Sequence, residues 1–280
     1  MRKLLAILVI VVVYGAFMLV GEVNQFPNLG WLLLFSAITL VGYGFRALRW
    51  KLLMDNQKMR MSFFDAFRTY IAGLAFVITP GKMGEVAKAE LMKDKFGFRR
   101  KPVVFTVIIE RIFDVVGLAI IGLIGAAWVA VTYIKQLLFL IGGVFVAMFI
   151  LYFFRSKIKL IESELEKLGN WKLITICTLL SLVAWGFEIF ELVLISSFVN
   201  FPLNFFQAAF AFTGATLIGN AVMTPGGIGA AEVGLIGILL QYGMTKPVAS
   251  LVTLTIRITT LWFGFFLGAF FWMLVSKQKS

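Results

Sequence analysis

Long apolar runs alternate with short polar segments along this chain. Crossing the hydrocarbon core of a bilayer takes about 20 helical residues. Six runs come close to that length or exceed it: Leu4–Val20, Leu29–Phe45, Pro102–Val131, Gln136–Phe154, Leu173–Val199 and Pro247–Val275. The first run follows two basic residues, as in a signal peptide, but no small-residue cleavage site follows it, so we expect a retained helix. The pattern predicts an all-α polytopic membrane protein with about six transmembrane helices.

Two further apolar segments, Ser62–Thr79 and Phe205–Thr224, each end at a Thr-Pro-Gly sequence. Thr is a good N-cap, Pro is favoured in the first helical turn, and Gly tolerates a tight turn. The stretch after the first break, 82–95, is too charged to cross a membrane, and the stretch after the second, 228–241, is short. We therefore expect two re-entrant helical hairpins. The alternative is that each hairpin crosses the membrane twice.

Basic residues predict the sidedness of the chain. Positive charge concentrates in cytoplasmic loops. With both termini cytoplasmic, most lysines and arginines fall on the cytoplasmic side, in segments 2–3, 46–60, 68, 82–101, 155–172 and 277–279. That set includes Arg46, Arg49 and Lys88, whereas Lys135 and Lys246 fall outside. We expect a multi-pass protein of the cell (cytoplasmic) membrane with cytoplasmic N- and C-termini.

The two breaks belong to similar sequences, ITPGKMGEVAKAELM at 78–92 and MTPGGIGAAEVGLIG at 223–237. Each is followed by an apolar span that carries an arginine, Arg111 or Arg257, at 31 positions after Pro80 and 32 after Pro225. If each half crosses the membrane three times, an odd number, the second half starts on the opposite side and has inverted topology. We expect a single transmembrane domain over 1–280, built from inverted pseudo-repeats at about 1–131 and 136–276, with a site near the midplane. The alternative is a chance coincidence of two tripeptides.

Composition narrows the chemistry. The chain is 61% apolar and 14% charged, which excludes a soluble globular domain and a disordered chain. It has no His and one Cys, which removes His-based catalysis and internal disulfides. We expect no cofactor and no bound metal. The net charge of +12 favours anionic lipid, not nucleic acid, as the partner.

Ionisable residues inside spans are costly and therefore mark candidate sites. Arg111 can pair with Asp114 three positions on, and we expect Arg257 to find its partner in Glu188 or Glu191. The guanidinium group of arginine can form two parallel hydrogen bonds to a phosphate or a carboxylate. The N-termini of the half-helices also favour an anion. The alternative is that these ion pairs only fix helix packing. The candidate substrate-binding residues are Thr79, Pro80, Gly81, Lys82, Gly84, Arg111, Thr224, Pro225, Gly226, Gly227, Gly229 and Arg257. The candidate polar pathway comprises Glu85, Glu110, Asp114, Glu188, Glu191 and Glu232.

The chain resembles the flippase-like family. The resemblance lies in the two break sequences together with FRALRWKLLM at 45–54 and IIERIFDVVGL at 108–118. This family is also called the lysylphosphatidylglycerol synthase transmembrane-region family. The resemblance covers the whole chain. It implies the membrane part of multiple peptide resistance factors, which moves an aminoacylated lipid between leaflets, and relatives near envelope glycosylation systems imply a polyprenyl-phosphate cargo as another option. We do not expect the soluble aminoacyl-transferase domain in this sequence.

The function that we expect is therefore translocation of an anionic or phosphate-linked lipid such as a phospholipid, an aminoacyl-phosphatidylglycerol or a polyprenyl phosphate. One alternative is an intramembrane lipid-modifying transferase or phosphatase that uses Glu85, Glu232, Arg111 and Arg257. Another is a scaffold that binds anionic lipid without moving it.

Overall fold

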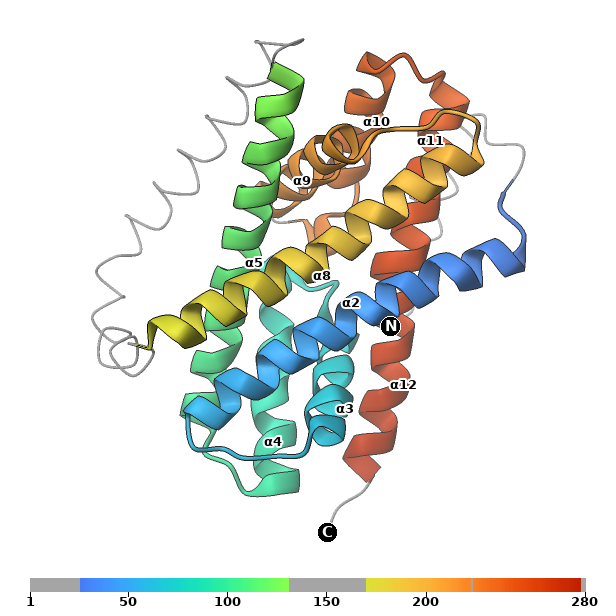
Figure 1. The fold of residues 1–280 in the computed structure, drawn as a ribbon. Coiled ribbons are helices and arrows are strands. Elements are labelled where there is room, and N and C mark those ends of the chain that lie inside the picture. The colour runs from blue at the N-terminus through green and yellow to red at the C-terminus, as the bar shows by residue number, and fades with distance from the viewer. Residues whose placement is uncertain (1–25, 131–169, 223, 278–280) are drawn as a thin grey trace.

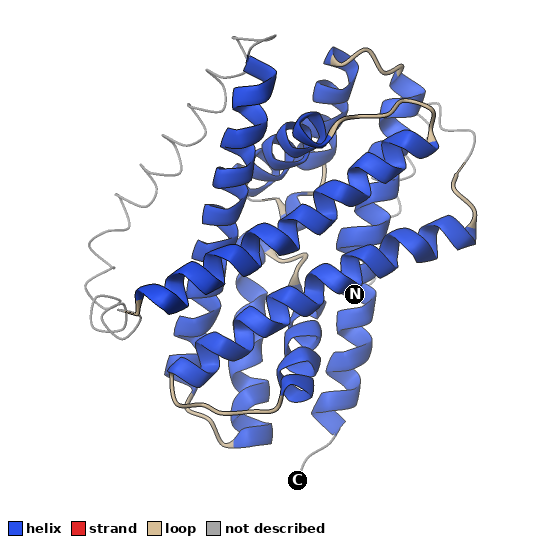
Figure 2. Cartoon of the chain, in the orientation of Figure 1, coloured by secondary structure: helices blue, strands red, loops and turns tan. Residues whose placement is uncertain are grey.

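The computed structural model describes residues 26–130, 170–222 and 224–277, and every regular element in those ranges is a helix (Figure 2). This confirms the all-helical class. Among the described residues, four helices are long and apolar enough to cross a membrane: Leu29–Asn56, Arg100–Val129, Trp171–Phe198 and Lys246–Lys277. The other two expected spans, Leu4–Val20 and Gln136–Phe154, lie outside the described residues.

Polar side chains fix where several helices begin. The side chain of Asn28 accepts a hydrogen bond from the N–H of Trp31 at the start of α2 (Leu29–Asn56), and that of Asn170 accepts one from Lys172 at the start of α8 (Trp171–Phe198). Helix α9 (Phe205–Ala221) begins with a reciprocal pair of hydrogen bonds between Asn204 and Gln207. Such caps satisfy N–H groups that have no partner within the helix.

The first break divides its segment as predicted. Helices α3 (Phe63–Gly73) and η1 (Leu74–Phe76) lead to Thr79, and the chain resumes as η2 (Pro80–Ala87) and α4 (Lys88–Phe96). The hydroxyl of Thr79 donates to the carbonyl of Phe76 at 2.6 Å and accepts from the N–H of Gly84 at 2.7 Å. One side chain therefore ties the end of the first half-helix to the start of the second.

The second break depends on glycine. It follows α9 and comprises η4 (Pro225–Gly227) and the turn that leads into α10 (Ala230–Gln241). Gly226, Gly227 and Gly229 have φ angles of 64°, 70° and 87°, a region that side chains with a Cβ rarely adopt. After α10, the chain runs through α11 (Lys246–Arg257), the π-helical turn η5 (Ile258–Trp262) and α12 (Phe263–Lys277).

Figure 1 shows α2 and α8 side by side across the front of the molecule, with α5 (Arg100–Ala130) and α12 more upright behind them. The pair α3–α4 lies at the end of the molecule where α12 ends, and α9–α10 lies toward the opposite end (Figure 1). Helix α5 packs on α9, and α12 packs on α3 and η1. The two breaks meet, because η2 packs against η4 and a Cβ on Gly226 would lie 3.4 Å from the Cα of Ile78.

Small residues allow the closest of these helix contacts. A Cβ on Gly125 of α5 would lie 2.8 Å from the backbone nitrogen of Phe210 in α9. A Cβ on Gly268 of α12 would collide with the backbone of Leu74 and Ala75 at η1. Small residues let membrane helices approach backbone to backbone. Each broken segment is thus held against a long helix from the other half of the chain.

Candidate functional site

A cavity lies where the two breaks meet the long helices. Its empty volume is about 860 Å³, counting the part that is open to the exterior. Part of its wall is apolar: Leu74, Val77, Phe212, Leu235, Ile256 and Leu261. The charged part consists of three arginines and three carboxylates: Arg46, Arg111, Arg257, Glu85, Asp114 and Glu188. The cavity therefore combines a hydrophobic surface with guanidinium groups, which suits an amphiphile.

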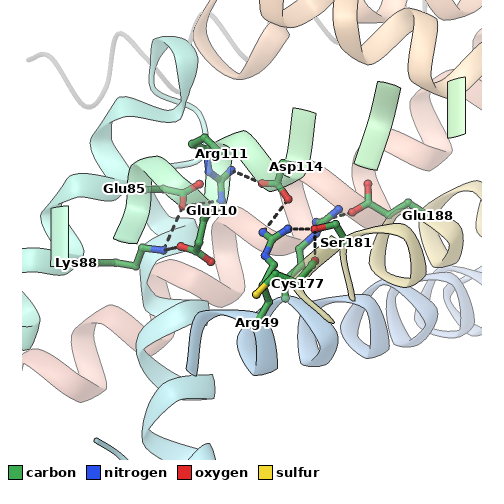
Figure 3. Close-up of polar contacts among 10 residues, drawn as sticks. Arg49, Glu85, Lys88, Glu110, Arg111, Asp114, Cys177, Ser181 and Glu188 are labelled. Carbon is green, nitrogen blue, oxygen red and sulfur yellow. Dashed lines mark hydrogen bonds and ion pairs between the residues drawn. The ribbon is translucent and has the colours of Figure 1, made fainter. Parts of the chain in front are cut away.

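Arg111 of α5 lines the cavity. It lies close to two carboxylates, Glu85 and Asp114 (Figure 3). Its Nη1 lies 3.1 Å from Oδ2 of Asp114, as the sequence predicts, and its Nη2 lies 3.3 Å from Oε2 of Glu85 in η2. The side chain of Arg111 is 24% exposed, whereas that of Glu85 is 1% exposed. Its buried Nε atom has no hydrogen-bond partner among the described residues. Arg111 thus lines the cavity while it is paired with two carboxylates.

Arg257 pairs with Glu232, so the predicted pairing with Glu188 or Glu191 is wrong. Nε of Arg257 donates to Oε1 of Glu232 at 2.7 Å, and Nη2 donates to the carbonyl of Gly226 at 2.7 Å. The other oxygen of Glu232 accepts the N–H of Gly229 at 2.7 Å. A carboxylate is favoured in the first turn of a helix, and Glu232 occupies that place in α10. The sequence interpretation missed the pair because it looked only within the spans for an acid.

The two ion pairs repeat one construction. Glu85 follows the first Thr-Pro-Gly break and is reached by Arg111 from the next long helix. Glu232 follows the second break and is reached by Arg257 in the same way. Each arginine therefore ties a long helix to the second half of a broken pair and also lines the cavity.

Glu110 is not among the residues that line the cavity, and it contacts Lys88, one of the basic residues expected on the cytoplasmic side. Nζ of Lys88 lies 2.7 Å from Oε2 of Glu110 and 3.5 Å from Oε2 of Glu85 (Figure 3). Lys88 is fully buried, and its ammonium group lies 4.2 Å from the centre of the Trp50 ring. Lys88 is thus a buried charge, because a carboxylate and an aromatic face replace the water around it.

Arg46 and Arg49 are likewise buried rather than exposed in a cytoplasmic loop, since α2 continues to Asn56 instead of ending near Phe45. Nη1 of Arg46 lies 2.7 Å from Oε1 of Glu188, and its guanidinium carbon lies 4.1 Å from the centre of the Trp185 ring. Nη2 of Arg49 lies 2.8 Å from Oδ1 of Asp114, and its Nη1 donates to the hydroxyl of Ser181 (Figure 3). A signal was present: the two arginines are three positions apart in an apolar stretch, so they share one helix face with Tyr43 and Trp50.

Glu191 of α8 is fully buried and lies outside the cavity lining. Thr39 of α2 donates to its Oε2 at 2.5 Å, and Thr259 of η5 donates to its Oε1. It therefore joins three elements through hydroxyl groups.

The break residues contribute unequally to the cavity. Gly226 and Gly227 line it, whereas Thr79, Gly84, Thr224, Pro225 and Gly229 are not among the lining residues. The backbone of Pro80, Gly81 and Lys82 belongs to η2, but the side chains of 80–83 lie outside the described part of the structure. The threonines and glycines of the breaks shape the backbone, and the arginines supply the charge.

The charges around the cavity are nearly balanced. The cations of the described network are Arg46, Arg49, Lys88, Arg111 and Arg257. Their carboxylate partners are Glu85, Glu110, Asp114, Glu188 and Glu232. Glu232 also occupies the N-terminus of α10. An anion at this helix end would therefore have to share the arginines with carboxylates.

Comparison with known proteins gives a family match over most of the chain. Residues 3–268 match the family described as the lysylphosphatidylglycerol synthase TM region. A UPF0104 membrane protein of Methanocaldococcus jannaschii is 27% identical over 219 residues, which are 72% of this chain and 94% of that protein. A UPF0104 membrane protein of Methanothermobacter thermautotrophicus is 29% identical over 103 residues, 37% of this chain and 31% of that protein, so this match spans about a third of the relative. No solved structure matches.

Proposed function

The chain belongs to the lysylphosphatidylglycerol synthase transmembrane-region family, and from that premise we propose that it moves an anionic or phosphate-linked lipid between the leaflets of the cell membrane. Phospholipids, aminoacyl-phosphatidylglycerols and polyprenyl phosphates all carry a phosphate group next to long apolar chains. This shared chemistry defines the cargo class.

The observation that carries the proposal is the cavity between the two breaks. Arg111 and Arg257 both reach it, with side chains 24% and 17% exposed, and apolar residues form the adjoining wall. A guanidinium group presents several N–H donors in a planar fork, which can hold a phosphate while keeping a carboxylate partner. A lipid phosphate can bind by sharing Arg111 with Glu85 and Asp114, and the reformed ion pairs favour its release.

The paired construction supports an inverted repeat with re-entrant hairpins. Each Thr-Pro-Gly break is followed by a glutamate and then by an arginine that reaches it. The packing is reciprocal too, since α5 covers α9 and α12 covers α3. With α3–α4 and α9–α10 toward opposite ends, the two hairpins would enter from opposite faces and meet at mid-depth (Figure 1). This is the arrangement in which transporters place their sites.

The test is lipid movement in vesicles. Purified protein is reconstituted in phosphatidylcholine vesicles with a trace of phosphatidylglycerol labelled by a nitrobenzoxadiazole dye, and dithionite, which does not cross the membrane, bleaches the dye in the outer leaflet. The proposal predicts bleaching beyond the outer-leaflet pool, faster for labelled phosphatidylglycerol than for labelled phosphatidylcholine. Bleaching that stops at the outer pool contradicts it. Mass analysis of the recovered lipid distinguishes the enzyme alternative, because movement leaves the lipid unchanged and a transferase or phosphatase does not.

A further inference from the structure

Among the buried carboxylates of the described residues, Glu191 has unusual partners. Five others, Glu85, Glu110, Asp114, Glu188 and Glu232, each lie within ion-pair distance of a lysine or arginine. Within the described part of the chain, Glu191 forms no ion pair, and the hydroxyls of Thr39 and Thr259 donate hydrogen bonds to it. An ionised carboxylate buried without a cation is costly, so this group requires another explanation.

The hydroxyl partners can accommodate both forms of the carboxyl group. When Glu191 is ionised, Thr39 and Thr259 both donate to it. When it is protonated, its O–H can donate to the oxygen of Thr259, because a hydroxyl accepts as well as donates. The hydroxyl hydrogen of Thr259 then has another acceptor, the carbonyl of Thr255 at 2.9 Å. No buried polar group loses its partner in either arrangement.

The neighbouring charges leave Glu191 without a nearby cation of its own. Glu188 lies one helical turn away on α8 and lines the cavity, but it is paired with Arg46 of α2. Tyr43 of α2 donates to the carbonyl of Thr260 in η5 at 2.8 Å. From α11, Arg257 is engaged by Glu232 and the carbonyl of Gly226. Among the described residues, none of these ionisable groups on α2, α8 and α11 forms an ion pair with Glu191.

The position of Glu191 links it to the cavity. Thr259 lies in η5, a π-helical turn, and such turns in α-helices often occur at functional sites. Arg257, which lines the cavity and holds the second break, lies two residues before Thr259 on the same continuous helix. A change in the hydrogen bonds of Glu191 therefore acts on the segment that positions Arg257.

We propose that Glu191 is a proton-binding site, and that exchange of this proton changes the packing of η5 against α2 and α8 and so couples lipid movement to pH. The ligand is a proton, which forms an O–H bond on a carboxyl oxygen of Glu191 and returns to water from the cavity side by way of Glu188. The coupling rests on the proposed function, whereas the proton site does not.

Two measurements test the two parts separately. Infrared spectroscopy of the protein in lipid nanodiscs follows the carbonyl band of protonated carboxylic acids through a pH titration. We expect a titrating band that is lost in Glu191→Gln and retained in Glu90→Gln, a matched change at an exposed carboxylate. In the vesicle assay, we expect the wild-type rate to depend on pH and Glu191→Gln to lose that dependence while Glu90→Gln keeps it. Removing one hydroxyl donor by Thr39→Val should move the midpoint of the band, which keeps the test open if Glu191→Gln fails to fold.

Each outcome has a separate meaning. The proton site is overturned if Glu191→Gln removes no titrating band from the infrared spectrum. It is also overturned if the midpoint of the band in Thr39→Val equals the wild-type value. A rate that follows sodium concentration at constant pH, and not pH, overturns proton coupling. A protein that moves no lipid at any pH overturns the proposed function and the coupling, while the infrared titration still decides the proton site.

Discussion

At the scale of single residues, the molecule buries charge by pairing it across helices. Arg111, Arg257 and Lys88 come from different elements, and each lies against a glutamate that another element supplies. Removing one member of such a pair strands the other in an apolar environment, which costs about 3–5 kcal/mol in buried cases. Two of these cations, Arg111 and Arg257, also line the cavity. Structural and binding roles therefore overlap there, and experiments must separate them.

Arg257→Gln is expected to lower the thermal stability of the protein in detergent and to abolish lipid movement, because it leaves Glu232 without its cation. Arg257→Lys is expected to restore movement only in part, since an ammonium group lacks the fork that reaches both Glu232 and the carbonyl of Gly226. The double variant Arg257→Gln/Glu232→Gln should regain stability and stay inactive. Recovery of lipid movement together with stability in the double variant would show that Arg257 acts only in packing.

Gly84→Ala is expected to destabilise the protein by about 1–3 kcal/mol, as overpacking usually does. A Cβ at this position would lie 2.6 Å from Cγ2 of Thr79 and 2.9 Å from Cβ of Phe76, so the first break would have to open. Gly186→Ala in α8 is the matched control, because nothing lies within 4 Å of its Cβ. Thermal unfolding in detergent measures both, and equal melting temperatures for Gly84→Ala and Gly186→Ala would refute the close contact.

The sequence predicts the chemistry of the breaks better than the pairing of the charges. Thr79, Pro80 and Gly226 act through local backbone geometry, which is visible in a tripeptide. The partners of Arg257 and Lys88 depend on which helices meet, and no local pattern carries that information. Arg46 resembles a loop charge by sequence because many basic residues follow it, and only its contact with Glu188 across two helices shows that it is buried.

At the scale of elements, the two broken pairs are alike in order but differ in how the break is made. The first uses a threonine hydroxyl that bridges Phe76 and Gly84, and the second uses glycines at positive φ. The two breaks lie against each other, since η2, which follows the first break, packs on η4 of the second break. The two breaks therefore contact each other, and their depth in the membrane stays a prediction.

Cross-linking tests the meeting of the breaks. Ile78 and Ile228 belong to one apolar cluster with Val77, Leu261 and Trp262. Cysteines at 78 and 228, in a Cys177→Ser background, are expected to react with a short bifunctional thiol reagent in native membranes. Cysteines at Phe64 and Leu240, near the outer ends of the two broken pairs, serve as the control that should not react. Equal cross-linking of both pairs, or none at 78 and 228, would contradict the arrangement.

At the scale of the whole molecule, the distribution of helices follows the apolar pattern, because a membrane span requires a long apolar helix wherever it occurs. The length of α2, however, does not follow the apolar pattern. The helix continues beyond its predicted end because Glu188 and Asp114 neutralise Arg46 and Arg49. With the charges satisfied, the helix extends through a stretch that looks like a loop. Sidedness, by contrast, still rests on the loop charges alone.

Thiol labelling tests the sidedness. Lys93 of α4 and Lys246 at the start of α11 are both exposed. With cytoplasmic termini, a membrane-impermeant maleimide should label Lys246→Cys in intact cells and should label Lys93→Cys only after the cells are permeabilised, both in the Cys177→Ser background. The reverse pattern would invert the topology, and Lys135, the other expected external lysine, lies outside the described residues.

The most direct test of the account compares two arginines of α5 in the vesicle assay. Arg111 lines the cavity, whereas Arg100 is exposed and hydrogen-bonded to Glu90 at the surface. The guanidinium of Arg100 also holds the pKa of the Glu90 carboxyl below its usual value, so both arginines have a carboxylate partner. We predict that folded Arg111→Gln protein loses the movement of labelled phosphatidylglycerol while Arg100→Gln retains the wild-type rate. Movement at the wild-type rate by folded Arg111→Gln protein would contradict the claim that this cavity carries the lipid headgroup.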